Sequence, residues 1–263
     1  MTKTETTKQI FSNPFAEVEI TPVTVSGQEI TSKMAVRVQA DDGEWSKAPS
    51  IVSSDYKLIR NDVARDIGDD IMSRSGMAWK SLKTLWDGKR WCAYSITENK
   101  IGDITGGADN HPVHVGMMLR NSYDGSGVLG LEMFACNMVC SNQYIERNRF
   151  GYFAIRHDNA RDFDVQDAIE NVSRGVDNIM AVAPKLSQMR SMELTAGRIF
   201  DAHRNCTIPK SMWGDVLSRM ALEEATVFGL YQALTNVASH QVGGFSSIGV
   251  GQSIGNAFLS DNW

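Results

Sequence analysis

The sequence has few of the features that mark secreted, membrane-bound or disulfide-rich proteins. Its 263 residues include only four cysteines, Cys92, Cys136, Cys140 and Cys206, too few for a disulfide scaffold in a chain of this length. No run of about 18 apolar residues occurs, so no membrane-spanning helix is expected. The start, MTKTETTKQIFSNPF, is polar and lacks the apolar core of a secretory signal. We therefore expect a cytoplasmic protein.

An excess of basic residues is also missing. The net charge is −5 and the isoelectric point is near 5.6. Proteins that bind nucleic acid usually have a basic balance or at least one basic face. Any such role for this chain must therefore rest on a local patch of positive charge.

Sequence motifs of common enzymes are absent or badly placed. There is no phosphate-binding G-x4-G-K-[ST] loop. The segment GQSIG at 251–255 has the spacing of a nucleophile elbow, but it lies in a Gly-rich segment with no strand before it. Paired carboxylates, such as Asp69 with Asp70, fall on predicted helices and are expected to be solvated. We predict a protein that is not an enzyme and that needs no cofactor.

Alternation of apolar and polar residues predicts an antiparallel sheet in the first half of the chain. Residues 113–120 and 129–135 alternate in this way. The Asp-Gly pair at 87–88 stands between strand-like runs, as in a two-residue hairpin turn, and Asp124-Gly125 is expected to turn the chain back. Residues 78–140 are therefore predicted to form an antiparallel meander of about four strands.

Helical periodicity appears before and after this meander. Ile59, Val63, Ile67 and Ile71 recur every four residues and predict a helix at about 60–75. Apolar residues then recur every three or four positions from 164 to 192, where Pro184 is expected to end or kink the helix. Further helices are expected at about 193–204, 211–224 and 225–238.

The predicted fold class is α+β: an antiparallel β-meander with one packed helix, followed by a helical C-terminal half. We expect a flexible leader over residues 1–20. A single domain over 21–240 is expected to be sheet-rich at 21–142 and helical at 143–240. The rest, 241–263, is rich in Gly and Ser and predicts a flexible or partner-docked tail.

A zinc site is one interpretation of the cysteines and histidines. Cys136 and Cys140 with His111 and His114 offer four ligands of the right type. Residues four apart on a strand, however, are about 13 Å apart, too far to share one ion. Buried free cysteines are the better interpretation, and no metal is expected.

The segment WKSLKTLWDGKRWCAY at 79–94 is the strongest candidate for a binding site. Lys80, Lys83, Lys89 and Arg90 stand against one acid, Asp87, for a local net charge of 4 − 1 = +3. The same segment holds the aromatic residues Trp79, Trp86, Trp91 and Tyr94. Cations that contact phosphates and rings that stack on bases are what single-strand binders use. The alternative, which the pattern alone favours slightly, is a two-faced hairpin with tryptophans in the core and lysines in water.

A second basic segment, IERNRFGYFAIRH, covers residues 145–157. It carries Arg147, Arg149 and Arg156 among aromatic residues. Two basic segments that flank one sheet would form a basic groove.

Several short motifs resemble a known family. NSYDGS (121–126), VCSN (139–142), RHDNARDF (156–163) and GLYQALTNVASH (229–240) are similar to motifs of the phage/plasmid-like family of uncharacterised proteins. The resemblance covers roughly residues 50–240. Tyr123 departs from the family, which often has His there, and this argues against His chemistry at that turn.

The resemblance implies a phage or mobile-element setting beside replication and recombination functions. The predicted order of a helix, a β-meander and helices is similar to the β-β-β-α core of the Redβ/RecT/Rad-type single-strand annealing proteins. This is an analogy at the level of the fold.

Together these features predict an ATP-independent single-stranded DNA binding and annealing protein. It would act in recombination as a homo-oligomeric ring or filament, in the host cytoplasm. Its predicted nucleic-acid-binding residues are Lys80, Lys83, Lys89, Arg90, Trp86, Trp91, Arg147, Arg149 and Arg156. The acidic end FLSDNW (258–263) would recruit a host single-strand-binding protein. The alternatives are a non-enzymatic structural or interaction protein of a phage without DNA affinity, and an enzyme or metal protein built around Cys136, Cys140, His111 and His114.

Overall fold

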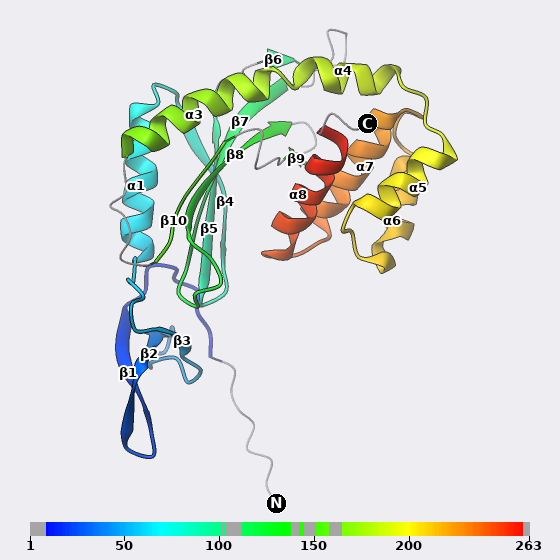
Figure 1. Ribbon diagram of the computed structural model, residues 1–263. Coiled ribbons are helices and arrows are strands. Elements are labelled where there is room, and N and C mark those ends of the chain that lie inside the picture. The colour runs from blue at the N-terminus through cyan, green and yellow to red at the C-terminus, as the bar shows by residue number, and fades with distance from the viewer. Residues whose placement is uncertain are drawn as a thin grey trace, which may run out of the picture.

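The computed structural model describes residues 9–100, 102–103, 112–137, 142–144, 151–157 and 165–259. A small sheet lies at one end of the molecule, a larger sheet forms the centre, and helices make up the C-terminal half (Figure 1). The predicted α+β class with a helical C-terminal half is confirmed.

The small sheet consists of three antiparallel strands near the N-terminus. They are β1 (Val18–Val25), β2 (Gln28–Val38) and β3 (Ser50–Ser53), in the order β1-β2-β3. Residues 9–20 are part of this structure, so the predicted flexible leader is wrong there. The backbone N–H of Lys47 donates to Gln9 Oε1 at 2.8 Å, and Val18 pairs with Val38. The apolar side chains of β1 pack on those of β2, which fixes the segment.

The large sheet is an antiparallel meander with two short additions. Its strands are β4 (Trp79–Trp86), β5 (Arg90–Thr97), β6 (Gly102–Asp103), β7 (Pro112–Ser122), β8 (Leu129–Asn137), β9 (Asn142–Tyr144) and β10 (Tyr152–Ile155). The order is β10-β8-β7-β5-β4, while β6 pairs with β7 and β9 with β8. The chain turns at both predicted Asp-Gly pairs, where Gly88 and Gly125 have φ of 88° and 72°. The connection at 87–89 has three residues and not the predicted two, and the connection at 123–128 is longer still. In the described part of the chain, β4 and β10 are the two edges.

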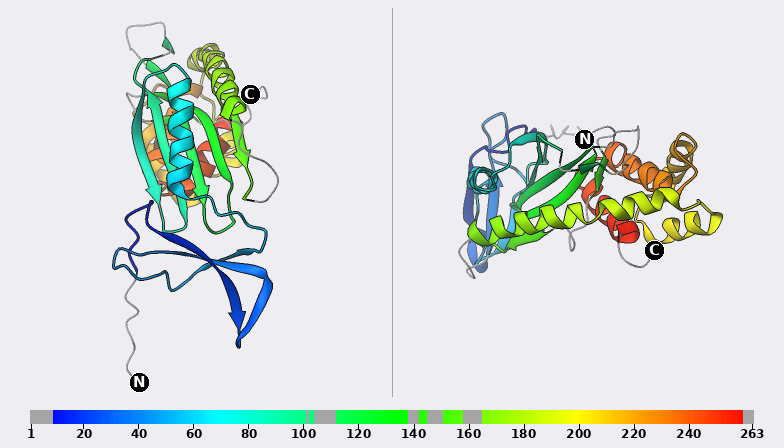
Figure 2. Two further views of the ribbon diagram at one scale, coloured as in Figure 1. Left: turned by 90° about the vertical axis from the view of Figure 1, so that its left-hand side faces the viewer. Right: turned by 90° about the horizontal axis from the view of Figure 1, so that it is seen from above.

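The helices α1 (Asn61–Arg74) and α3 (Val165–Met180) cover what we call the front face of the large sheet (Figure 2). The predicted helix at 60–75 matches α1, but its predicted apolar stripe is only partly buried, because Val63 is 47% exposed. Ile71 of the stripe is buried against the sheet, together with Ala64 and Gly68. A Cβ on Gly68 would lie 2.7 Å from Leu119 Cδ2, so glycine lets α1 approach β7 closely.

The helix predicted from 164 to 192 is two helices, α3 and α4 (Ala183–Ser191). Pro184 lies in the first turn of α4, where the missing N–H costs nothing. The chain then forms α5 (Ala196–Asn205), the short η1 (Lys210–Met212), α6 (Trp213–Met220), α7 (Val227–His240) and α8 (Ser246–Leu259). No helix in the part of the chain described here combines the length and apolar character that a membrane span needs.

Residues 246–259, which were expected to belong to a flexible or partner-docked tail, form α8 beside α7 (Figure 1). Ile254, Phe258 and Leu259 are fully buried. Part of the proposed recruiting end is thus inside the core, and residues 260–263 lie outside the described residues. Glycines between the apolar positions hid the helical period in the sequence.

Helix α8 also contacts what we call the back face of the large sheet. Ile248 packs there with Tyr94 of β5. The Gln252 side chain donates to Glu132 Oε2 at 2.7 Å. Glu132 is fully buried, and its other oxygen lies 3.0 Å from Arg120 Nη2. A buried carboxylate needs such partners, so this cluster ties the last helix to the sheet.

Candidate nucleic-acid interface

The hairpin β4–β5 separates its rings from its lysines. Trp86 pairs with Trp91 and Ser81 with Ser95, and these side chains point to the front face. Lys83 pairs with Tyr94, which points to the back face. Rings and cations are therefore not interleaved on one surface. This is the two-faced hairpin that was the alternative interpretation of the sequence.

A β-bulge between Ser81 and Lys83 decides which residues share a face. Strict alternation would put Lys80 and Lys83 on opposite faces, because they are three positions apart. The extra residue in the bulge reverses the alternation. Lys80 and Lys83 consequently both belong to the back face of β4, and Trp79 and Trp86 both belong to the front.

The tryptophans differ in what they can do. Trp91 is 2% exposed, and its ring meets Phe15 edge-on at 5.9 Å. Trp86 meets Tyr123 in the same manner at 6.0 Å and is packed between two apolar clusters. Base stacking needs an open ring face. Trp91 is therefore a core residue, which corrects its predicted role, and Trp86 is chiefly a packing residue.

The predicted cations also divide into two kinds. Lys80 is exposed, and Lys83 is half-buried with its Nζ 4.5 Å from the centre of the Tyr94 ring. Burial lowers the pKa of Lys83. Lys80, Lys83 and Lys89 have no carboxylate partner among the described residues. Arg90 instead binds Asp87 through Nε and Nη2, at 2.8 and 2.7 Å, and its guanidinium lies 4.6 Å from the Phe245 ring centre.

The described part of the second basic segment, residues 151–157, lies at the opposite edge of the sheet. Arg156 is exposed just after β10. Four strand spacings of about 4.8 Å separate β10 from β4, or about 19 Å. Among the described residues, Arg156 is thus on the other edge of the sheet from Lys80 and Lys83. Arg147 and Arg149 lie outside the described residues.

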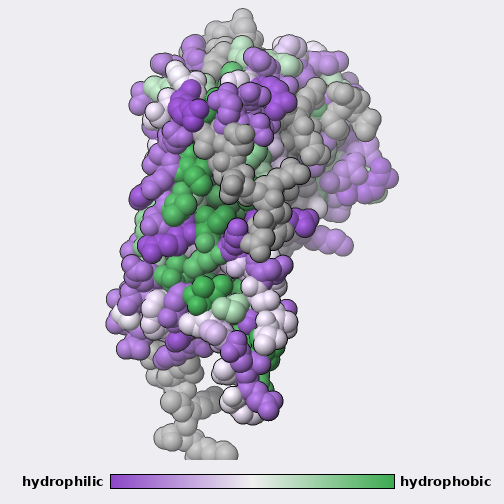
Figure 3. Space-filling view, turned by 60° about the vertical axis from the view of Figure 1, so that its left-hand side comes forward, coloured by the Kyte–Doolittle hydropathy of each residue, from purple (hydrophilic) through white to green (hydrophobic). Residues whose placement is uncertain are grey.

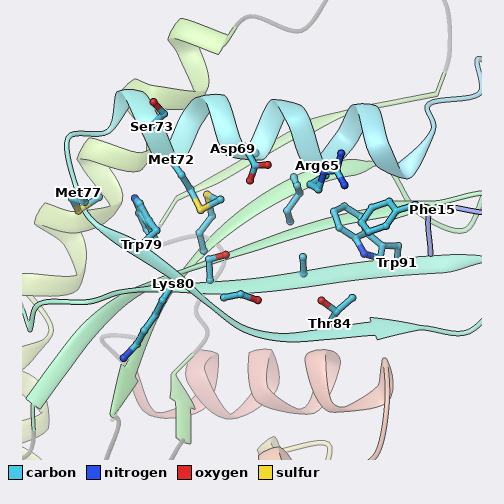
Figure 4. Close-up of a pocket in the computed structure, with 16 residues that line it drawn as sticks. Phe15, Arg65, Asp69, Met72, Ser73, Met77, Trp79, Lys80, Thr84 and Trp91 are labelled. Carbon is cyan, nitrogen blue, oxygen red and sulfur yellow. The ribbon is translucent and has the colours of Figure 1, made fainter. Parts of the chain in front are cut away.

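A groove runs along the front face between α1 and the edge strand β4. It has a volume of about 470 Å³. Its walls include Met72, Trp79 and Met117, and Figure 4 shows the Lys80 side chain pointing away from it. The groove exists because α1 packs over β7 and leaves β4 uncovered on this face.

Apolar side chains are also exposed on the side of the molecule that carries α1. Figure 3 shows them as a band bordered by hydrophilic residues. Phe15, which lines one end of the groove, is 36% exposed. Sequence reasoning missed the groove, because no local pattern reveals which strand a helix leaves uncovered.

The NSYDGS segment serves as scaffold. The Asn121 side chain donates to the backbone oxygen of Ile59 at 2.8 Å. The Tyr123 hydroxyl accepts from the N–H of Asn61, the first residue of α1, at 2.7 Å. Asp124 accepts from the N–H of Ser126 inside the turn. These bonds hold the start of α1 against the end of β7 and thereby set one wall of the groove.

Two of the four residues considered as zinc ligands, His114 and Cys136, belong to the described residues. His114 and Cys136 are cross-strand neighbours, and His114 Nδ1 lies 2.8 Å from the backbone oxygen of Thr97. Burial raises the pKa of Cys136 to about 12, which disfavours the thiolate that binds zinc. His111 and Cys140 lie outside the described residues. Within those residues, no group of three potential ligands comes together.

Comparison with models of known protein families finds a match that assigns the chain to a family. The model of a domain of unknown function, DUF932, matches residues 48–243. The chain belongs to the DUF932 family. The match extends from just before β3 to just before α8, so it includes the hairpin and the groove.

The prediction that the chain belongs to a family of uncharacterised proteins is confirmed. The match does not link the chain to phages or to annealing proteins. No curated protein matches the chain. No solved structure matches it either.

Proposed function

We propose that this DUF932 protein binds single-stranded DNA along the outer edge of β4 and anneals complementary strands without ATP. The observation that carries the proposal is the row of lysines along β4 and its turn, none of which has a carboxylate partner within the described residues. Lys80 and Lys83 share one face of the strand, and Lys89 follows in the turn. Lysines in such a row attract a phosphate backbone and release its counterions on binding.

The fold supports the proposal by analogy. Strands β4, β5, β7, β8 and β10 form a meander, and the long helix α3 follows and packs on the front face. This order is similar to the β-β-β-α core of the Redβ/RecT/Rad-type annealing proteins. A protein of that kind would act in the recombination system of a phage or another mobile element, as a homo-oligomeric ring or filament. Annealing needs no nucleotide hydrolysis, because base pairing releases free energy.

A second candidate function rests on the same lysines. Charged residues on an edge strand prevent sheets from pairing edge to edge. Under this alternative, Lys80 and Lys83 keep the sheet from aggregating, and the chain is a structural or interaction protein without DNA affinity. The two candidates differ in one measurable property, which is affinity for single strands.

The first test is the fluorescence anisotropy of a labelled oligo-dT, titrated with protein at low and high salt. We expect binding that weakens with salt. Lys80→Glu should weaken it further, by about tenfold, and reduce the salt dependence by about one ion. The matched control is Lys33→Glu, because Lys33 is an exposed strand lysine of the other sheet. This control should bind like the wild type.

The outcomes separate the candidates. No binding at low salt would favour the interaction protein. Equal losses in both variants would mean that net charge matters and that β4 is not the site. If binding is found, two labelled complementary strands mixed with the protein without ATP should pair faster than alone. Unchanged pairing would remove the annealing function and leave strand binding.

A further inference from the structure

The groove between α1 and β4 has walls that are mostly apolar, apart from Arg65, Asp69 and Ser73 of α1, and a hydroxyl-bearing floor. Ser81 and Ser95 are register partners on the two strands, and Thr84 pairs with Ala93 beside them. All three hydroxyl-bearing side chains line the groove. None of their hydroxyls has a hydrogen-bond partner within the described residues. The floor is therefore polar and open, while the walls are mostly apolar.

This combination limits the kind of occupant. A purely apolar chain would cover the hydroxyls of Ser81, Thr84 and Ser95 and leave them without hydrogen bonds, which is unfavourable. A fully polar ligand would gain nothing from Met72 and Met117. A flat ring with a polar edge satisfies both parts, because its face contacts apolar atoms and its edge reaches the hydroxyls.

Trp79 provides a fixed aromatic wall. Its indole N–H donates to Ser75 Oγ at 2.9 Å, which holds the ring in place. The side chain is half-buried, unlike that of Trp91, so part of its ring faces the groove. A ring held in this way can stack on a nucleotide base, whatever the sequence of the strand.

Two charged side chains of α1, Arg65 and Asp69, line the groove. Arg65 already pairs with Asp66 at 3.0 Å and lies over the Phe15 ring, which leaves Asp69 as the unpaired one of the two within the described residues. Asp69 of α1 is exposed and points into the groove (Figure 4), where a carboxylate repels phosphates and can accept from the N–H groups of bases. Lys80 points away from the groove on the other side of β4. Phosphates are thus favoured on the lysine side, and bases on the side of the groove.

We infer that the groove receives unstacked bases of the single strand whose phosphates lie along the lysines of β4. This inference rests on the proposed function and adds to it the site of the bases. The strand crosses the free edge of β4, with its backbone outside and its bases against Trp79 and the floor. Such contacts tolerate any sequence, because every base has a stacking face.

The test compares oligo-dT with an abasic oligonucleotide of the same length and charge, by anisotropy at one low salt concentration. Wild-type protein should bind the abasic strand about tenfold more weakly, since stacked bases contribute strongly to affinity. Thr84→Trp fills the groove from its floor and should reduce affinity for oligo-dT to that for the abasic strand. Thr31→Trp is the matched control, an exposed strand threonine on β2, and should change nothing.

Each result has a definite meaning. Equal affinity of the wild type for the two oligonucleotides overturns the inference and leaves lysine-dependent binding intact. A folded Thr84→Trp variant that binds oligo-dT like the wild type also overturns the inference. That result is expected if the groove receives an apolar ligand or a peptide and not the bases of DNA. If the wild type binds neither oligonucleotide at low salt, the proposed function fails together with the inference. The comparison of oligonucleotides uses wild-type protein only, so it decides the matter even if Thr84→Trp does not fold.

Discussion

The two faces of one hairpin have different tasks in this fold. On the front face, Trp91 and Trp86 are packed under Phe15 and Tyr123. On the back face, Lys83 lies over Tyr94 at the border of the sheet, and Lys80 extends into solvent. The comparison teaches that residues mixed along a strand need not meet in space. Aromatic and basic residues can serve one ligand only if it crosses the edge between the faces.

The largest expected effect contrasts two tryptophans of the front face. Trp91→Ala should lower the free energy of unfolding by about 3–5 kcal/mol, because it leaves a cavity in the core. Trp79→Ala should cost only about 1–2 kcal/mol, since its ring is half-exposed in the groove. Urea unfolding of the two variants measures the difference. Equal losses would mean that the groove is closed in solution.

An intermediate effect concerns the pH dependence caused by Lys83. Its pKa is lowered by burial from 10.5. Between the folded pKa and 10.5 the unfolded chain binds more protons, so the stability of the wild type should rise with pH in this range. The gain relative to Lys83→Met should be at most about 1.4 kcal/mol per pH unit. Below the folded pKa the two proteins should differ by a constant amount.

Urea unfolding of both proteins from pH 7 upward measures this difference. A difference that falls with pH would show that the attraction between Lys83 and the Tyr94 ring outweighs its burial. The back face would then stabilise the charged lysine.

The smallest expected effect is on stability at Lys80. Lys80→Ala should change the free energy of unfolding by less than about 0.5 kcal/mol, because the side chain is exposed and no described residue offers it a carboxylate partner. Thermal unfolding beside the wild type is sufficient to measure it. A loss above about 1 kcal/mol would mean that Lys80 has a structural role, and its effect on DNA binding would need another explanation.

Local patterns in the sequence predicted much of the fold. Both Asp-Gly turns, the meander and the helix at α1 follow from short-range rules, because each depends on neighbouring residues. The face of the sheet on which each aromatic side chain lies does not follow from such rules. The bulge between Ser81 and Lys83 exchanges the faces of every residue before it, and nothing in WKSLKTLW marks its place.

Distant contacts explain the remaining errors. Residues 9–20 and α8 look loose in the sequence, since their partners lie far along the chain. Val18 needs Val38, and Phe258 needs Tyr231, whose ring centre is 5.2 Å away. The groove likewise depends on how α1 sits over β7, which the close contact of Gly68 with Leu119 sets.

The bond between Gln252 and Glu132 has a consequence for how the protein is made. The two residues are 120 positions apart. At about 5–20 residues per second, a ribosome needs about 6–24 s to travel from one to the other. During this interval Arg120 has already been made, but the helix that covers Glu132 has not. The back face of the nascent sheet therefore stays uncovered until α8 has been synthesised, and a chaperone would bind it during this interval.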